Sequence, residues 1–402
     1  MPHSATTSFN IRHQIATALC FFSLGFGTAA WAPLIPLAQT RLSLSHADFG
    51  MLLLCAGVGS MLAMPLAARA AQHWGCRGVL AMVLLVLMLI LPALAYSPTV
   101  WMMAVSLFCF GASAGALGVS VNLQATLLEQ QQQRSLMSLF HGVCSLGGLV
   151  GVLGMTSVLS LGVASLAAAF GVSLIMLLLA LFALPYCLKS QNTGDQPNKA
   201  GVAKRAPTWG VLGIGMICFI AFLSEGAAMD WSGIYLHQQF NVALQHAGLA
   251  YSVFAALMVV GRFSGHWISN SYGAKRTVLI SSLLAALGLF TVVLAPIWQV
   301  VLLGYALLGL GSANIVPLMF SRAAQQTQLP SHVALSYVSM LAYTGSLMGP
   351  ALVGFAGQQF GLMWVFSAIA AALLMIAILN HYTALDETNL DDPLIDAAVS
   401  NS

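Results

Sequence analysis

The feature that most constrains this chain is a series of long, uninterrupted apolar stretches. The segment 79–95, for example, contains no charged residue and no hydroxyl or amide side chain. A run of this kind lacks the alternation of apolar and polar side chains found in the strands of membrane barrels, so it predicts a helix. Within lipid, only helices and closed barrels satisfy every backbone polar group. We therefore expect an all-helical protein that crosses the membrane several times.

The composition of the 402-residue chain excludes an ordinary soluble fold. Hydrophobic residues make up 59% of the chain and charged residues 6%, against roughly 45–50% and about 25% in soluble domains. Thirteen basic and ten acidic residues are too few to cover the surface of a soluble protein of this size. The net charge of +3 and the lack of a Lys/Arg run argue against nucleic-acid binding.

The chain shows no motif for metal binding or for soluble-enzyme chemistry. Its seven cysteines lie mostly in apolar stretches, without a CxxC pair or a Cys/His spacing typical of metal sites. We expect these cysteines to act as small hydrophobic residues. A GxSxG turn, an HExxH helix and a Walker loop are also missing from the sequence. We therefore expect no catalytic residue, no metal and no cofactor, and any active transport should draw on an ion gradient.

Polar, glycine, proline and charged residues divide the chain into twelve predicted spans. Six spans precede a polar segment at 189–207 and six follow it, which predicts an N-terminal bundle (1–188), a linker (189–207), a C-terminal bundle (208–382) and an acidic tail (383–402). The first apolar segment has no persuasive cleavage site and is read as a span, not as a signal peptide. The predicted spans lie near residues 13–38, 47–68, 78–96, 98–123, 135–160, 163–188, 208–236, 246–268, 277–295, 298–322, 332–357 and 360–382.

The two halves resemble each other at a constant offset. Gly50 and Gly248 are separated by 198 residues (248 − 50 = 198). The same offset relates Gly75 to Gly273, Arg77 to Lys275, Gly111 to Gly309, Gly147 to Gly345 and Gly151 to Gly349. Two similar halves in one membrane protein predict a pair of pseudo-symmetric six-helix bundles, with a binding site between them near the membrane midplane.

The distribution of Lys and Arg predicts the orientation of the chain in the membrane. Twelve basic residues fall on one side of the predicted spans, and only Arg41 falls on the other. Because basic loops stay in the cytoplasm, both termini and the linker are expected there. The twelve are Arg12, Arg69, Arg77, Arg134, Lys189, Lys199, Lys204, Arg205, Arg262, Lys275, Arg276 and Arg322.

The six-plus-six arrangement and the basic loops after the second and eighth spans resemble the major facilitator superfamily. The family's loop signature, similar to GxxxDRxGRR, is matched by Gly75 with Arg77 and by Gly273 with Lys275. The acidic position of the signature is occupied by Gln72 in the first copy and by Asn270 in the second copy. The resemblance covers nearly the whole chain and implies a membrane transporter whose two bundles rock about a central site.

Shorter segments resemble a narrower branch, the bacterial inner-membrane YbjJ and rhizopine-transporter-like group, which lies near the fucose-permease-like carriers. These segments are SEGAAMDW at 224–231, GRFSG at 261–265, VNLQ at 121–124 and the stretch 141–147 that begins His-Gly. The resemblance draws attention to His141, Asn122 and Gln124 as residues for proton coupling or substrate binding. Relatives often carry a Glu where this chain has Gln124, which weakens a proton role at that position.

Glu225 and Asp230 are the only acidic residues well inside the predicted spans, since Asp48 lies near the outer face at the start of the second span. An ionised carboxylate at the centre of a bilayer costs about 2.5–3.5 kcal/mol on insertion scales, so both should face the bundle interior or water. Glu225 lies about 25 Å along a helix that begins near Thr208, and it is either a proton or substrate site or a structural carboxylate. Asp230 lies about 140° further around this helix, so the two need not form a pair. Two roles fit Asp230: a salt bridge in a gate, or a position at a hydrated helix end.

Polar and aromatic side chains within the other spans suit a neutral or weakly charged organic ligand. Residues that could line its site are Trp31, Trp231, Tyr235, Asn314, Tyr337 and Tyr343. Residues that could act in gating are Arg262, Gly75, Arg77, Gly273 and Lys275. Packing is the competing interpretation for each aromatic residue, and snorkelling to the interface is the competing one for Arg262.

The sequence therefore favours a secondary transporter of a sugar, polyol or related solute in the bacterial inner membrane, coupled to protons and acting as a monomer. Efflux of amphipathic drugs is an alternative, since 19 methionines suit an adaptable apolar cavity. A sensor or binding protein that does not transport is an alternative of another class. An enzyme is not expected, because the histidines are scattered instead of gathered at one membrane face.

Overall fold

The computed structural model describes residues 4–132, 136–188, 207–326, 329 and 331–388, and every regular element among them is helical. The first half contains α1 (Ser4–Ala29), η1 (Ala32–Leu34), α2 (Ile35–Leu42), α3 (His46–Tyr96), α4 (Val100–Gln132), α5 (Met137–Ser160), α6 (Ser165–Ala183) and η2 (Leu184–Tyr186). The second half contains α7 (Trp209–Phe240), η3 (Leu244–His246), α8 (Leu249–Tyr272), α9 (Ala274–Leu294), α10 (Trp298–Ser312), α11 (Ile315–Gln325), α12 (Ser331–Phe360) and α13 (Leu362–Thr388).

Twelve stretches of these described helices are long and apolar enough to cross a membrane. They agree with the twelve predicted spans, so the expectation of an all-α polytopic membrane protein is confirmed. Helix α3 holds two spans, His46–Ala71 and His73–Tyr96, and the chain turns at Gly75, near the start of the second span. Gly75 has φ 70°, a backbone conformation that favours glycine, and this is what reverses the chain between the two spans.

The internal repeat extends from the sequence to the backbone conformation. Residues with positive φ recur in the two halves at nearly the same offset, including two that are not glycine. The pairs are Ser43 with Asn241 (both φ 52°), Gly75 with Gly273 (φ 70° and 77°) and Gly162 with Gly361 (φ 82° and 85°). The offsets are 241 − 43 = 198, 273 − 75 = 198 and 361 − 162 = 199. The loops therefore turn in the same way in both halves.

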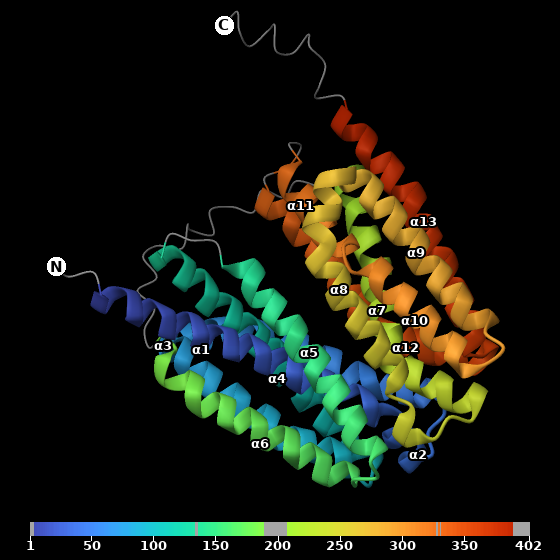
Figure 1. Cartoon of the computed structure of the whole chain (residues 1–402), viewed down its shortest axis with the longest axis horizontal. Coiled ribbons are helices and arrows are strands. Elements are labelled where there is room, and N and C mark those ends of the chain that lie inside the picture. Colours follow the sequence, from blue (N-terminus) through green and yellow to red (C-terminus); the bar gives the residue numbers. More distant parts are fainter. Residues whose placement is uncertain (1–3, 133–135, 189–206, 327–328, 330, 389–402) are drawn as a thin grey trace, which may run out of the picture.

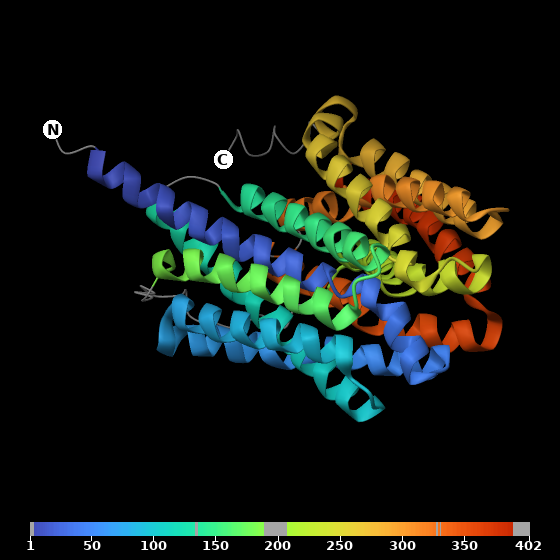
Figure 2. The same ribbon diagram turned by 60° about the horizontal axis from the view of Figure 1, so that its bottom comes forward.

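The helices form two groups that meet at one end and diverge at the other (Figure 1). Helices α1–α6 make one group and α7–α13 the other, and the second view shows the same separation (Figure 2). The groups touch mainly through α3 against α12 and α5 against α8. We call the end near α2, with His46 and His246, the far end, and the end with Tyr186 and Thr208 the linker end.

At the far end, the two groups pack backbone against backbone through glycines. A Cβ atom on Gly50 of α3 would lie 2.6 Å from the carbonyl oxygen of Pro350 in α12. A Cβ atom on Gly354 would lie 2.4 Å from the carbonyl oxygen of His46. Both distances are shorter than van der Waals contact, so only glycine permits this approach. The far end is thus closed by close helix contact, in the manner of small-residue interfaces in membranes.

Hydrogen bonds between neutral side chains join the two groups at the same end. They link His46 Nε2 with Gln238 Oε1 (2.9 Å), His246 Nδ1 with Ser160 Oγ (2.9 Å) and Thr156 Oγ1 with Ser252 Oγ (3.1 Å). Nearer the linker end, Arg262 of α8 donates to Ser145 Oγ of α5 at 3.0 Å. Bonds of this neutral kind contribute only about 0.5–1.5 kcal/mol each, so the far end is closed by contacts that can break singly.

The single basic residue on the far side has a structural explanation. The Arg41 guanidinium donates hydrogen bonds to the carbonyl oxygens of Ala95 (2.6 Å), Leu94 (2.9 Å) and Ser97 (3.1 Å) at the end of α3. The last carbonyl groups of a helix have no partner within the helix, and they carry partial negative charge. Arg41 therefore caps α3, which accounts for its exception to the charge distribution.

The glycine contact at the far end generates a first prediction. Replacing Gly354 by Ala places a methyl group against the His46 carbonyl, so the closed far end is disfavoured and conformers with an open far end gain population. Spin labels on the exposed far-end residues Val163 and Gln299 would report this as a longer distance distribution. Gly154→Ala is the control, because a Cβ atom on Gly154 meets no atom within 4 Å. An unchanged distribution in Gly354→Ala would contradict the role of this contact.

Candidate functional site

A cavity of about 440 Å³ lies between the two groups of helices. Its size falls within the range typical of small-molecule sites. The first half contributes Trp31, Leu53, Ala56, Gly57, Ser60, Met61, Met64, Leu107 and Phe110. The second half contributes Gly226, Met229, Asp230, Met340, Tyr343, Thr344, Ser346, Leu347 and Pro350. Among these described lining residues, Asp230 carries the only formal charge.

The cavity is closed toward the far end and accessible toward the linker end. Its lining follows α3 from Leu53 to Met64, which is about 16 Å at 1.5 Å per residue. At the far end of this path Leu53 is 4% exposed, whereas Met61 is 57% exposed. On the opposite wall, Met340 is 60% exposed. The cavity therefore has a floor near the far end and a mouth toward the linker end.

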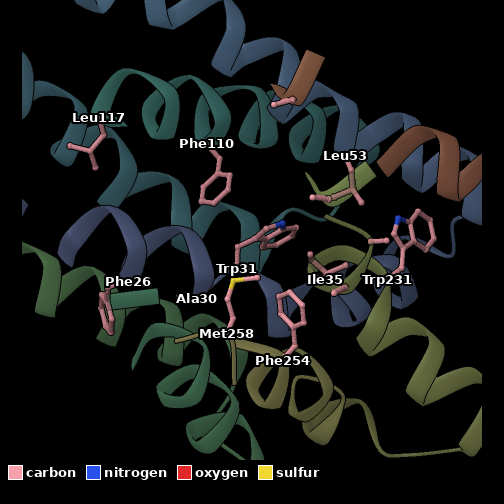
Figure 3. Close-up of a cluster of buried hydrophobic side chains, with 14 of the residues drawn as sticks. Phe26, Ala30, Trp31, Ile35, Leu53, Phe110, Leu117, Trp231, Phe254 and Met258 are labelled. Atoms are coloured by element: carbon pink, nitrogen blue, oxygen red, sulfur yellow. The ribbon is translucent and has the colours of Figure 1, made fainter. Parts of the chain in front are cut away.

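Trp31 and Asp230 are the most buried polar or aromatic residues of this floor, at 2% and 5% exposure. Trp31 follows the end of α1 and precedes the short η1, where Pro33 interrupts the regular helix. The indole lies 6.4 Å from the Phe110 ring, centroid to centroid. The close-up shows Trp31 between Phe110 and Ile35, in the middle of the cluster (Figure 3). The floor thus combines an aromatic wall with one carboxylate.

The carboxylate of Asp230 faces this cavity and makes no hydrogen bond or ion pair with the described part of the chain. Glu225 lies five positions earlier on α7 and is not among the lining residues. Its Oε1 atom is buried and has no hydrogen-bond partner among the described residues. A buried polar atom without a partner is costly, so each carboxylate requires a proton or an external partner.

A chain of polar groups runs from the first half to Arg262 of the second. Asn122 of α4 bonds His141 Nε2 at 3.1 Å. Ser145, one turn after His141, donates to the His141 carbonyl at 3.1 Å and accepts the hydrogen bond from Arg262. The fold therefore connects three of the predicted residues, Asn122, His141 and Arg262, across the two halves.

Other predicted residues lie in packing positions away from the cavity lining. Gln124 is fully buried, where it accepts from the Leu188 amide (3.2 Å) and donates to Thr17 (3.4 Å). Asn314 donates to the Gly261 carbonyl at 2.9 Å and fills the space beside Gly265. Both amides join helices within one half. Neither amide contacts the cavity.

The predicted aromatic residues divide in the same way. Tyr343 lines the cavity together with Trp31. Trp231 is fully buried and packs edge-on against His46 and Phe49, and Tyr235 is buried against Phe366 with its hydroxyl donating to a backbone carbonyl. Tyr337 is partly buried on α12, three residues before the lining begins.

The predicted gating residues lie at the linker end. Gly75 and Gly273 form the turns between spans, as their positive φ angles require. The Arg77 amide donates to the Leu188 carbonyl at 3.1 Å, and the Lys275 carbonyl accepts from Asn380 at 2.9 Å. The first bond joins its loop to the segment after η2, and the second, from the Asn380 side chain, joins its loop to α13. The side chain of Gln72 is not among those that the structure describes.

Several lining residues were not singled out from the sequence, among them Phe110, Ser60 and Ser346. A periodic signal was present: Gly57, Ser60, Met61 and Met64 follow the i, i+3, i+4, i+7 pattern of one helix face, as do Met340, Tyr343, Thr344 and Leu347. In an apolar span, however, such a face has the same composition as a face that contacts lipid or another helix. Only the packing of the halves distinguishes it.

Comparison with known families identifies the chain. The family model described as Major Facilitator Superfamily matches residues 17–270 and 214–393. The chain belongs to this superfamily. Its members found by sequence include an uncharacterized MFS-type transporter of Yersinia pestis, 38% identical, with 93% of this chain and 97% of the relative covered. Another is the membrane protein MosC of Rhizobium meliloti, 32% identical over 90% of this chain and 88% of MosC.

Solved structures of superfamily transporters share the fold. The crystal structure of the nucleoside transporter NupG superposes with a TM-score of 0.71 at 15% identity, covering 93% of this chain and 98% of NupG. A bacterial homolog of the lysosomal transporter Spinster superposes with a TM-score of 0.71 at 12% identity, covering 94% of this chain and 97% of that one. At these identities the likeness of the solved structures concerns the fold alone. The sequence relatives that are named as transporters support a transporter instead of an enzyme.

The geometry of Gln124 yields a second prediction. Gln124→Ala removes the acceptor of the partly buried Leu188 amide and one of the two hydrogen bonds of the buried Thr17 hydroxyl, so unfolding should become easier by about 1 kcal/mol. Thermal unfolding of the purified protein would detect this as a lower midpoint. The control is Gln299→Ala, at an exposed position of α10 where little change is expected. A Gln124→Ala protein of normal stability that transports poorly would instead give this residue a direct role in transport.

Proposed function

We propose that this chain is a secondary active transporter that moves a small polar organic solute across the membrane by alternating access. The observation that carries the proposal is the cavity lined by both halves, with its floor at the closed far end and its mouth toward the linker end. A site shared by two rocking bundles is what alternating access requires.

The contacts at the far end suit such a movement. They consist of glycine approaches and of hydrogen bonds between neutral groups, without an ion pair among the described contacts there. Each of these hydrogen bonds can be exchanged for a hydrogen bond to water when the far end opens. The Arg262–Ser145 bond, the contact between halves nearer the linker end, supports a hinge region around the middle of α5 and α8.

The lining supports a sugar, polyol or related compound as the solute. The Ser60 and Ser346 hydroxyls come from opposite halves and make no hydrogen bond with the described part of the chain. Hydroxyl groups of a solute can bond both at once, which would join the halves around it. Trp31 offers an aromatic face against which a sugar ring or carbon chain can pack.

Glu225 is the candidate for proton coupling. Its Oε1 atom is buried without a partner among the described residues, and it lies on α7 between the linker end and Asp230. A carboxyl group in this setting can exchange a proton as the two halves rock and its surroundings change. His141 and Asn122 connect this region to the first half and support a path for the proton.

The distribution of basic residues supports a bacterial inner-membrane protein with the linker end and both termini in the cytoplasm. In this orientation the mouth of the cavity faces the cytoplasm. One chain supplies both walls of the cavity, which supports a monomer as the transporting unit.

Glu225→Gln tests the proton coupling. The amide has the same size but cannot carry a proton, so accumulation of the solute under an imposed pH gradient should fall at least tenfold, whereas exchange without a gradient should persist. The measurement is flux into proteoliposomes of a sugar or polyol selected by a thermal-shift screen. Alkalinisation outside the vesicles during uptake would support symport.

Asp48→Asn is the matched control, because it removes an acid at the far-end surface and should leave uptake unchanged. Gradient-driven accumulation at the normal level in Glu225→Gln would exclude Glu225 as the coupling residue. Solute binding without flux under any gradient would favour a sensor over a transporter.

A further inference from the structure

The floor of the cavity has the chemistry of a site for a positive charge. Asp230 is 5% exposed, lines the cavity and has no hydrogen-bond or ion-pair partner in the described part of the chain. The lining, as far as the structure describes it, contains no Lys, Arg or His. The carboxylate is therefore turned toward the space that the solute would occupy, with no cation of the protein to pair with it.

The surroundings of Asp230 increase its preference for a cation. Most of the other lining residues are apolar, so a charge at the floor interacts through a medium of low polarity, where attraction between opposite charges is strong. The indole of Trp31 and the ring of Phe110 lie 6.4 Å apart in the same lining. Aromatic faces attract cations, with Trp the strongest of the three rings.

The same features disfavour an anion. A carboxylate or phosphate on the solute would meet the Asp230 charge with no basic residue of the lining to offset it. Burying an ion without a compensating partner costs free energy. Arg262 is not among the lining residues and is bonded to Ser145.

We propose that the transported solute carries an ammonium group, and that Asp230 binds this group as its counter-ion at the cavity floor beside Trp31. Asp230 thereby determines specificity, whereas Glu225, which is not among the lining residues, remains available for the proton. The inference rests on the transport function proposed above and specifies the chemical class of its solute.

The test compares compounds that differ only in an ammonium group. Three pairs serve: choline with 3,3-dimethylbutan-1-ol, glucosamine with glucose, and ethanolamine with ethylene glycol. Binding to the purified full-length protein is followed by thermal stabilisation and by Trp fluorescence. We expect the charged member of at least one pair to bind at least tenfold more tightly than its neutral partner.

Two variants assign the preference to its residue. Asp230→Asn keeps the shape and removes the charge, so the preference should disappear. Asp48→Asn, which removes an exposed acid outside the cavity lining, should retain it. Asp230→Glu keeps the charge and should retain the sign of the preference, which gives a second test if Asp230→Asn does not fold.

Equal binding within all three pairs by the wild-type protein, or no binding of any charged member, would overturn the inference, and so would an undiminished preference in Asp230→Asn. Flux in proteoliposomes separates this result from failure of the transport function. Flux of neutral compounds without preference for charge would remove the ammonium site and leave the transporter. Charged compounds that bind at Asp230 but never cross the membrane would remove the transporter and leave the site.

Discussion

The structure depends on one constraint, the cost of leaving a polar group without a partner in an environment that holds little water. Most of the described buried polar side chains meet it locally, although Trp231, Ser232, Tyr305 and Ser312 each bury a polar atom without a partner. Arg41 satisfies three carbonyl groups at the end of α3, and Gln124 joins two helices through an amide and a hydroxyl. Against this background, the unpartnered carboxylates Glu225 and Asp230 are exceptions, and exceptions of this kind mark the places where a solute or a proton completes the structure.

The second element of the design is the contrast between packing within each half and packing between halves. Within a half, glycines let helices approach closely, as Gly111 does against Ala56 and its counterpart Gly309 does against Phe254. Between the halves, the close approach of backbone to backbone through glycine occurs at the far end, where Gly50 and Gly354 meet. The halves are thus closely packed within and joined at the far end by neutral contacts. This combination lets two bundles move as bodies about a shared cavity.

Much of this arrangement could be predicted from residues alone. The apolar runs gave the twelve spans, the offset between glycines indicated two similar halves, and the scarcity of acids singled out Glu225 and Asp230. Which lining residues surround the solute could not be predicted. Met61 and Met340 look like any apolar side chain of a membrane span, and they line the cavity because α3 and α12 pack against each other across the two halves. Periodicity identifies a helix face but not what that face meets.

The sequence by itself determined that the chain lies in a lipid bilayer, how many spans it has and which few charged residues lie within them. The reason is that the cost of burying a charge or a backbone group in lipid is a property of each residue. Only the tertiary structure decided how the two carboxylates differ. The turn of α7 between them and the approach of the first half place Asp230 in the cavity lining and leave Glu225 outside it. That distinction depends on which helices pack around α7, and packing between distant segments is not encoded in any local pattern.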